Sequence, residues 1–522
     1  MSVNGPFSGH AIRSIQVEDD ADESHAFTET EDDYLQETGK ASMASSIANL
    51  CNTIIGTGML ATPGAFRYTG LLPGIFLIIL CGFTSAAGLI LLTMCADTLG
   101  GRKNSFFSIA LKTIPNGARF FDAAIAIKCF GVSISYLIIS GQLMPQVVLS
   151  FAKALNSHET LPGFLLDRSF WIFAFMVALV PLCFLRRLDS LRHTSYLSLL
   201  AVMYLVIIVL YYSLPSKKAH LPEPGPIFII NIDGHHFLSV FPVFVFAFTC
   251  AQNMLPVHNE MRAARPLHFF RTRKAIFSSI SLAGTVYLIV GVLGYLSFGS
   301  NVGANIITMY PDTSLFVCFG RVSIVILTLC SYPLQVHPCR AALDKVLAPR
   351  RASLDTSPST QSNGTPDTRY RDDEGNISTD YAGHDSADAS TQQHLLRPTS
   401  NDNAAQSEMS IQRLCILTGI ILTATFIIAL IVDDLGLILG YVGSVGSTTI
   451  SFILPGLLFS SLHREGSRSK FRRLAQGLVV YGVLVMIMCL AANILKSFRT
   501  IPSKADAEAF AVETRRFSSL IL

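Results

Sequence analysis

Charged residues are scarce in this chain. Asp, Glu, Lys and Arg make up 14% of its 522 residues, and apolar residues make up 50%. A soluble protein typically carries about 25% charged residues, so this chain lacks the charge to cover the surface of several soluble domains. A soluble cytosolic enzyme is therefore excluded. The formal net charge of +3 is too small to indicate a nucleic-acid partner.

Several short motifs are missing as well. No Cys-x-x-Cys pair and no Cys/His ligand spacing occurs, which argues against a zinc site or a disulfide framework. No His-Glu-x-x-His sequence and no Walker sequence occurs either, so we expect neither an enzyme nor a bound cofactor. All but one of the eleven cysteines lie within apolar runs, where we expect them to pack between helices.

The polar segments are confined to three places. Residues 1–41 hold ten carboxylates, which predicts a disordered acidic cytosolic tail. The segment lacks the basic start and the apolar run of a signal peptide. Residues 347–411 are rich in Ser, Thr, Asp, Asn and Gln, which predicts a disordered cytosolic insertion. Residues 497–522 form a C-terminal tail.

Long apolar runs dominate the rest of the chain. A membrane-spanning helix needs about 20 predominantly apolar residues. Eleven runs of this kind occur, at 44–66, 71–95, 120–150, 170–185, 195–214, 237–258, 275–298, 314–338, 412–432, 436–460 and 474–495. We predict an all-α polytopic protein embedded in the lipid bilayer, with helices one to eight in 42–346 and helices nine to eleven in 412–496.

Lys and Arg are unevenly distributed over the gaps between these runs. They concentrate in the gaps at 96–119, 186–194, 259–274 and 461–473, whereas the alternate gaps hold few of them. Positively charged loops stay on the cytosolic side of a membrane. The asymmetry predicts a cytosolic N-terminus and, with an odd number of spans, a lumenal C-terminus.

The first run, SMASSIANLCNTIIGTGMLATPGAFRYTG, is interrupted by glycine. Gly56-Thr57-Gly58 stands at mid-membrane depth, and we expect Pro63 and Gly64 to end the helix. Unwound backbone at this depth is tolerated only where it faces protein or a water-filled cavity. Its exposed N–H and C=O groups can hold the carboxylate and ammonium of a zwitterion. The alternative is that the glycines only allow close helix packing.

The sixth run, LSVFPVFVFAFTCAQNMLPVHNEM, has a matching interruption. An aromatic stretch that ends at Phe248 gives way to the polar segment Thr249–Asn253, and Pro256 follows. Polar residues at mid-span are costly unless they face a cavity or a neighbouring helix. Breaks in spans one and six occupy corresponding positions of two five-helix halves, which is typical of an inverted-repeat transporter with its site at the midplane.

These motifs resemble the amino acid/auxin permease family. The resemblance rests on N-x-x-N-x-x-x-G-x-G from Asn49 to Gly58, on KCFGVSISYLIISGQLMP at 128–145 and on SYPLQVHPCRAALDKV at 331–346. It covers about 42–346 and 412–496. It implies a leucine-transporter-type fold, with a 5+5 inverted repeat and an eleventh helix, and secondary transport of amino acids. The long insertion resembles that of the fungal vacuolar branch, which is related to the sodium-coupled neutral amino-acid transporters.

The resemblance also implies a substrate site at the two breaks. There the backbone and side chains around the breaks would hold the amino acid: Thr53, Gly56, Thr57, Gly58, Phe248, Thr249 and Cys250. The sodium-coupled relatives place a cation between spans one and eight, which here implies Asn52, Thr328 and Ser331. The alternative is that the two hydroxyls bond to their own helix. Lys128 is an intramembrane ionisable residue and a second candidate for coupling.

The expected function is secondary active transport of amino acids across a vacuolar or lysosomal-type membrane. We expect a proton as the coupling ion, because the resemblance is to vacuolar members. Sodium at Asn52, Thr328 and Ser331 is the alternative, in a plasma-membrane transporter. A second alternative is a membrane amino-acid sensor that binds its ligand without carrying it.

Overall fold

The computed structural model describes most of the membrane part of the chain. The described residues are 41–100, 104–155, 161–184, 194–231, 234–261, 267–347, 410–463 and 469–499. The predicted disordered segments 1–41 and 347–411 and the C-terminal tail 497–522 therefore fall, apart from a few residues at their edges, outside the described residues. Across the described part the chain is helical, and its only β pairing is an isolated bridge between Ala41 and Met261.

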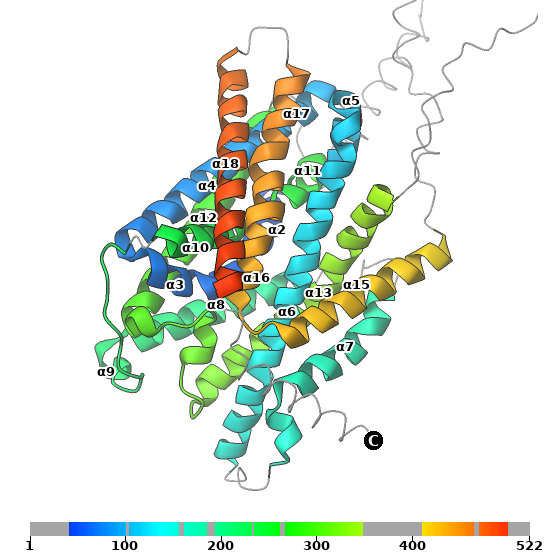
Figure 1. Ribbon diagram of the computed structural model, residues 1–522. Coiled ribbons are helices and arrows are strands. Elements are labelled where there is room, and N and C mark those ends of the chain that lie inside the picture. The colour runs from blue at the N-terminus through cyan, green and yellow to red at the C-terminus, as the bar shows by residue number, and fades with distance from the viewer. Residues whose placement is uncertain are drawn as a thin grey trace, which may run out of the picture.

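Each of the eleven predicted apolar runs is helical in the structure (Figure 1). The corresponding helices are α2 and α3 (Met43–Ile54 and Thr57–Thr69), α4 (Leu71–Leu99), α6 (Ala118–Ala154), α7 (Arg168–Phe184), α8 (Thr194–Ser213), α10 and α11 (Gly234–Ala247 and Ala251–Glu260), α12 (Leu267–Phe298), α13 (Leu315–Leu347), α15 (Ile411–Ile431), α16 and α17 (Leu435–Val442 and Leu454–Leu462) and α18 (Ser469–Arg499). Two short helices, α5 (Phe106–Thr113) and α9 (Pro215–Lys218), lie in the connections. Among the described residues, eight helices are long and apolar enough to cross a membrane by length and composition alone.

The outer helices present apolar side chains to the surroundings. Phe83 on α4 is 69% exposed, and Ile416 on α15 and Ile487 on α18 are exposed as well. In Figure 1, α15 and α7 lie side by side at the edge of the bundle, and α17 and α18 form a second pair. A soluble protein rarely exposes apolar surface on this scale, so these faces are the lipid-facing surface of a multi-pass membrane protein.

The prediction that Pro63 and Gly64 end the first span is wrong. Helix α3 continues to Thr69 and stops at Gly70, whose φ of +78° is readily adopted only by glycine. A proline inside a helix removes one backbone hydrogen bond, and here the buried packing of α3 keeps the helix intact through Pro63. Gly64 serves a packing role, because a Cβ there would lie 2.6 Å from the carbonyl oxygen of Gly303.

The tenth span contains two π-helical turns, at Gly443–Ser447 and Thr449–Ile453. They replace the α-helix between α16 and α17, and their residues are almost all buried. Such turns are rare and recur at functional sites. Glycine lets this segment approach its neighbours closely, because a Cβ on Gly443 would overlap the carbonyl oxygen of Pro242 on α10.

Candidate transport site

The first span breaks between α2 and α3. Helix α2 ends at Ile54, and Gly56 is the N-terminal cap of α3. Ile55 donates its N–H to the Cys51 carbonyl at 2.7 Å, which closes the last turn of α2. Thr57 lies in the first turn of α3, where backbone N–H groups have no partner within the helix. The interruption is therefore Ile55–Gly56, slightly before the Gly-Thr-Gly motif predicted to carry it.

The sixth span breaks at Phe248–Cys250. Helix α10 ends at Ala247, and Cys250 is the N-terminal cap of α11. The hydroxyl of Thr249 donates to the Val245 carbonyl at 2.9 Å. Ser85 on α4 donates its hydroxyl to the Phe248 carbonyl at 2.8 Å. The break thus occurs where the aromatic stretch meets the polar segment, as the sequence predicts, and part of its freed backbone is satisfied by a neighbouring helix.

The two breaks lie next to each other. A Cβ on Gly58 would lie 3.0 Å from the Cα of Ala247, so the start of α3 touches the end of α10. The hydroxyl of Tyr287 on α12 lies 2.6 Å from the Ile54 carbonyl oxygen and 2.7 Å from the Ala247 carbonyl oxygen. One side chain thus bonds the carboxyl ends of both half-helices that precede a break.

A cavity of about 970 Å³ runs from the first break to the face on which the segment 104–107 lies. Its walls come from α2, α6, α11 and α13. Four of the predicted site residues line this cavity, namely Asn52, Thr53, Gly56 and Ser331. The structure therefore brings together part of the predicted substrate group and part of the predicted coupling group.

The other predicted substrate residues are packed beside the cavity. Thr57 and Gly58 lie in the buried first turn of α3, and Thr57 lines only a separate space of about 10 Å³. Phe248 packs edge to face on the Tyr287 ring, with ring centroids 5.1 Å apart. Thr249 and Cys250 are buried within the second break.

The predicted cation residues are divided between two spaces. Asn52 and Ser331 face the large cavity, while Thr328 faces the small space beside Gly56. Thr328 lies 2.8 Å from the Ser140 hydroxyl and donates within its own helix to the carbonyls of Ile324 or Val325. This three-residue donor set does not converge in one cavity. The described residues contain no group of three or more His, Cys, Asp or Glu arranged to hold a metal ion.

Lys128 is buried in the first third of α6, with 4% of its surface exposed. It packs on the π-helical turn of the tenth span, where a Cβ on Gly446 would lie 2.7 Å from the Lys128 Cβ. Lys128 does not line the large cavity. A side chain larger than that of glycine at position 446 would therefore clash with Lys128, and α6 could not pack this closely on the tenth span.

Other polar residues that line the cavity were not selected from the sequence. Among them are Asn49, Asp122, Tyr136, Gln252, Asn253 and Gln335. The side-chain amide of Asn253 donates to the Thr53 hydroxyl at 2.7 Å, across the two half-helices α11 and α2. Gln252 and Asn253 could have been selected from the sequence, because two neighbouring polar residues at mid-span indicate a position that faces a cavity or another helix. Asp122 lies in the first turns of α6, and its Oδ2 is buried with no hydrogen-bond partner in the described residues.

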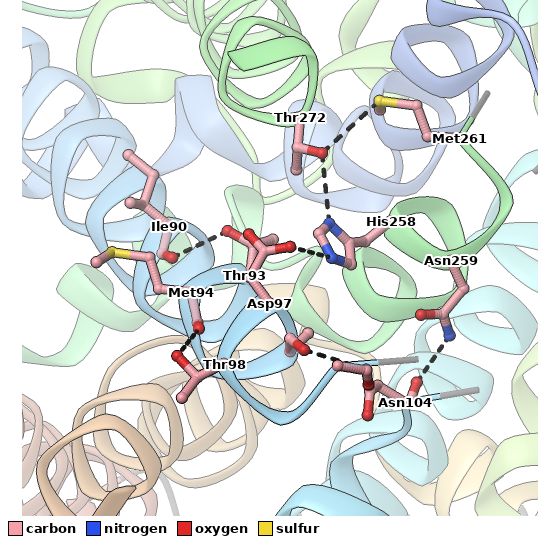
Figure 2. A network of polar contacts seen from close by, with 12 residues as sticks. Ile90, Thr93, Met94, Asp97, Thr98, Asn104, His258, Asn259, Met261 and Thr272 are labelled. Atoms are coloured by element: carbon pink, nitrogen blue, oxygen red, sulfur yellow. Dashed lines mark hydrogen bonds and ion pairs between the residues drawn. The ribbon is translucent and has the colours of Figure 1, made fainter. Parts of the chain in front are cut away.

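Figure 2 shows a polar network that includes Asn104, one of the residues that line the cavity. His258 on α11 lies between two helices, with Nε2 3.4 Å from Asp97 Oδ1 on α4 and Nδ1 3.3 Å from the Thr272 hydroxyl on α12. The next residue, Asn259, donates to the Asn104 carbonyl at 2.8 Å. Asn104 itself lines the cavity. The network therefore holds the C-terminal end of α11 against the segment that forms the edge of the cavity.

At the end of the molecule opposite the opening of the large cavity, the helices and their connections pack closely. The connection between α12 and α13 packs on α3 at Gly64 and Gly303. Arg321 on α13 is fully buried and fastens this connection, donating to Asp312 Oδ1 and to the Tyr310 carbonyl, each at 2.6 Å. The large cavity therefore opens at one end, and at the other end the α12–α13 connection packs on α3 beside a separate cavity of about 200 Å³ that Gly64, Val302 and Ala304 help to line.

Two broken helices that meet beside a one-sided cavity define a membrane transporter. Among solved structures, the inward-facing conformation of Mhp1 matches 91% of this chain and 94% of its own, with a TM-score of 0.50 and 11% sequence identity. That match shows the fold, which is the leucine-transporter type that the resemblance implied.

The chain belongs to the transmembrane amino acid transporter protein family, whose model matches residues 39–495. Vacuolar amino acid transporter 5 of Schizosaccharomyces pombe is 40% identical over 469 residues, covering 88% of this chain and 96% of that protein. Vacuolar amino acid transporter 6 of Saccharomyces cerevisiae is 34% identical over 475 residues, covering 87% and 98%. The family membership inferred from the motifs is confirmed, and the family consists of transporters rather than enzymes.

Proposed function

We propose that this protein is a secondary active transporter that moves amino acids across a vacuolar or lysosomal-type membrane, driven by protons. The observation that supports this most strongly is the meeting of the two helix breaks at the closed end of a large cavity. The transport family and the names of the two fungal relatives agree with the proposed substrate and membrane.

The substrate's two charged ends would bind at the breaks. The N-terminus of α3 carries free N–H groups and the positive end of a helix dipole, which favour a carboxylate. The C-terminal end of α2, where Asn52 and Thr53 line the cavity, carries the negative end of a helix dipole, which favours an ammonium group. Thr53 and Gly56 already face the cavity. Thr57, Gly58, Phe248, Thr249 and Cys250 would complete the site after a small rearrangement of the breaks.

Proton coupling needs a titratable group within reach of the cavity. Asp122 and Glu260 both line it, and Asp122 combines burial with an unpartnered carboxylate oxygen among the described residues. A buried carboxyl that gains and loses a proton changes its charge inside the fold, which can bias one conformation over another. Asp122 is therefore the preferred proton carrier, and Lys128 is the second candidate. Sodium bound by Asn52, Thr328 and Ser331 stays the alternative.

In this proposal the cavity opens to the cytosol. The segment 104–107 at its mouth lies within a gap rich in Lys and Arg, and such gaps are cytosolic. The N-terminus is then cytosolic and the C-terminus lumenal. Spans one to five and six to ten would form the two inverted repeats, with breaks at corresponding positions, and α18 would be the eleventh helix.

A counterflow assay separates transport from sensing. Purified protein is reconstituted in liposomes that are preloaded with one unlabelled amino acid at a time, from the set of twenty, and uptake of the same radiolabelled amino acid is followed. A transporter accelerates the exchange of its substrates above that of protein-free liposomes. Saturable binding in detergent without any accelerated exchange would instead establish a sensor.

A further inference from the structure

Tyr287 stands at the junction of the two broken helices. Its side chain is fully buried on α12, and its hydroxyl lies 2.6 Å from the Ile54 carbonyl oxygen and 2.7 Å from the Ala247 carbonyl oxygen. Ile54 is the last residue of α2, and Ala247 is the last residue of α10. The two acceptors are 193 residues apart in the sequence, yet one hydroxyl reaches both.

These carbonyls need a donor. The last carbonyls of a helix have no partner within that helix, and both residues are buried. A buried carbonyl without a donor costs free energy. In a membrane span no water replaces the missing donor unless a cavity reaches it, and neither Ile54 nor Ala247 lines the large cavity.

A tyrosine has one hydroxyl proton and can therefore serve two carbonyls only by sharing it. Sharing requires both acceptors to stay within hydrogen-bond distance of the same oxygen. If α2 moved away from α10, one of the two carbonyls would lose this donor. The Tyr287 ring also packs on Phe248 in the second break. The hydroxyl and the ring thus hold both breaks at once.

We propose that Tyr287 is a positioning residue that holds the ends of α2 and α10 together while the cavity is open, and that this double contact is given up when the two helices separate during transport. The double hydrogen bond favours the conformation described here, in which the cavity is open. This rests on the proposed function in taking the breaks as the moving parts of a transport cycle. It adds a specific residue, outside the substrate site, that sets the balance between the open and closed cavity.

The test is the variant Tyr287→Phe. Two matched controls, Tyr332→Phe and Tyr295→Phe, each lose a buried tyrosine hydroxyl at another place in the fold. Tyr332 is fully buried and its hydroxyl lies 2.7 Å from the Thr425 hydroxyl on α15. Tyr295 is fully buried on the same helix as Tyr287 and accepts from the Phe228 N–H at 3.0 Å. Neither control touches a helix break. Each variant is purified in full length and its folded fraction and melting temperature are measured first.

Cavity opening is followed by the labelling rate of an engineered thiol. Ala341 lines the cavity and is exposed, so Ala341→Cys reports whether the cavity is open to a membrane-impermeant maleimide. Rates are corrected for the parent protein, which retains the native cysteines. We expect Tyr287→Phe to lower the labelling rate about two- to tenfold, the equilibrium change that corresponds to one lost hydrogen bond. Turnover in counterflow should fall with little change in KM, while both controls match the parent.

Tyr287→Phe with unchanged labelling and turnover per folded molecule, or with the same small effects as Tyr332→Phe, would overturn the proposal. If Tyr287→Phe does not fold, 3-fluorotyrosine at position 287 keeps the ring and hydroxyl while strengthening the donor. It should raise the labelling rate, and an unchanged rate would overturn the proposal. Labelling does not depend on transport, so a parent protein that fails to carry amino acids still shows whether Tyr287 controls the opening of the cavity.

Discussion

Asn253 on α11 donates its side-chain amide to the hydroxyl of Thr53 on α2 at 2.7 Å. The Thr53 hydroxyl in turn donates to the Asn49 carbonyl at 2.9 Å. Both side chains line the cavity, and they join the two half-helices that flank its inner end. This contact would have to break or rearrange whenever α2 and α11 separate.

Removing this contact should weaken transport more than folding. Asn253→Ala and Thr53→Val each delete the hydrogen bond between these two side chains, worth about 0.5–1.5 kcal/mol, which corresponds to roughly two- to tenfold in KM or turnover. Thr53→Val also removes the bond to the Asn49 carbonyl of its own helix. The double variant should be no worse than the stronger single variant, because the two residues share one interaction. Initial rates of counterflow over a range of substrate concentrations provide the measurement.

Thr285→Val is the matched control for Thr53→Val. Thr285 lies on α12 and is exposed, and its hydroxyl bonds to the Ser281 carbonyl of its own helix. It should transport like the parent protein. Additive losses in the Asn253→Ala/Thr53→Val double variant would show that the two side chains act independently.

Gly58 should tolerate no larger side chain. A Cβ there would already lie 3.0 Å from the Cα and 3.1 Å from the Cβ of Ala247, so Gly58→Val forces α3 away from α10. Overpacking of this kind costs about 1–3 kcal/mol, and we expect a lower melting temperature together with loss of counterflow. Gly477→Val on α18 is the control, since nothing lies within 4 Å of a Cβ at that site. Equal behaviour of the two variants would contradict close packing at Gly58.

Asp122 should be required for proton-driven uptake but not for exchange. Asp122→Asn keeps the size of the side chain and removes the titratable group. We expect it to abolish concentrative uptake driven by a pH gradient while counterflow continues, since exchange needs no net proton movement. Glu260→Gln is the control at the exposed mouth of the same cavity and should keep driven uptake. Undiminished driven uptake by Asp122→Asn would remove Asp122 as the proton carrier.

The orientation of the chain is open to a direct test. Asn363 and Asn376 each begin an Asn-x-Ser/Thr sequence in the 347–411 insertion, outside the described residues. If the insertion is cytosolic, neither site meets the glycosylation machinery, and treatment with an endoglycosidase leaves the gel mobility unchanged. A variant with an acceptor site introduced after residue 499 should be glycosylated. Glycan at Asn363 or Asn376 would reverse the assignment.

The helix breaks could be predicted from the sequence because their chemistry is local. Glycine at mid-span in the first run and polar residues at mid-span in the sixth are costly unless the backbone is interrupted or faces a cavity. Their exact residues could not be predicted, because capping decides where each half-helix ends. Ile55–Gly56 rather than Gly56–Gly58 forms the first interruption.

Which side chains face the cavity could not be read from the sequence. Thr328 and Ser331 are three residues apart on α13, which predicts a shared face, but a step of three residues leaves side chains about 60° apart around a helix. That angle is enough for Ser331 to line the cavity while Thr328 packs against Ser140. The packing of Lys128 against Gly446 likewise depends on contacts between segments that are distant in the sequence.

Uptake into proteoliposomes with independently imposed proton and sodium gradients tests the central claim most directly. A proton gradient supplies about 1.4 kcal/mol per pH unit for each proton moved, so two units support roughly a hundredfold amino-acid gradient at one-to-one coupling. We predict concentrative uptake that follows the pH gradient, is unaffected by sodium and is lost in Asp122→Asn. Uptake that follows the sodium gradient at clamped pH, and is lost in Asn52→Ala or Thr328→Ala, would contradict the account.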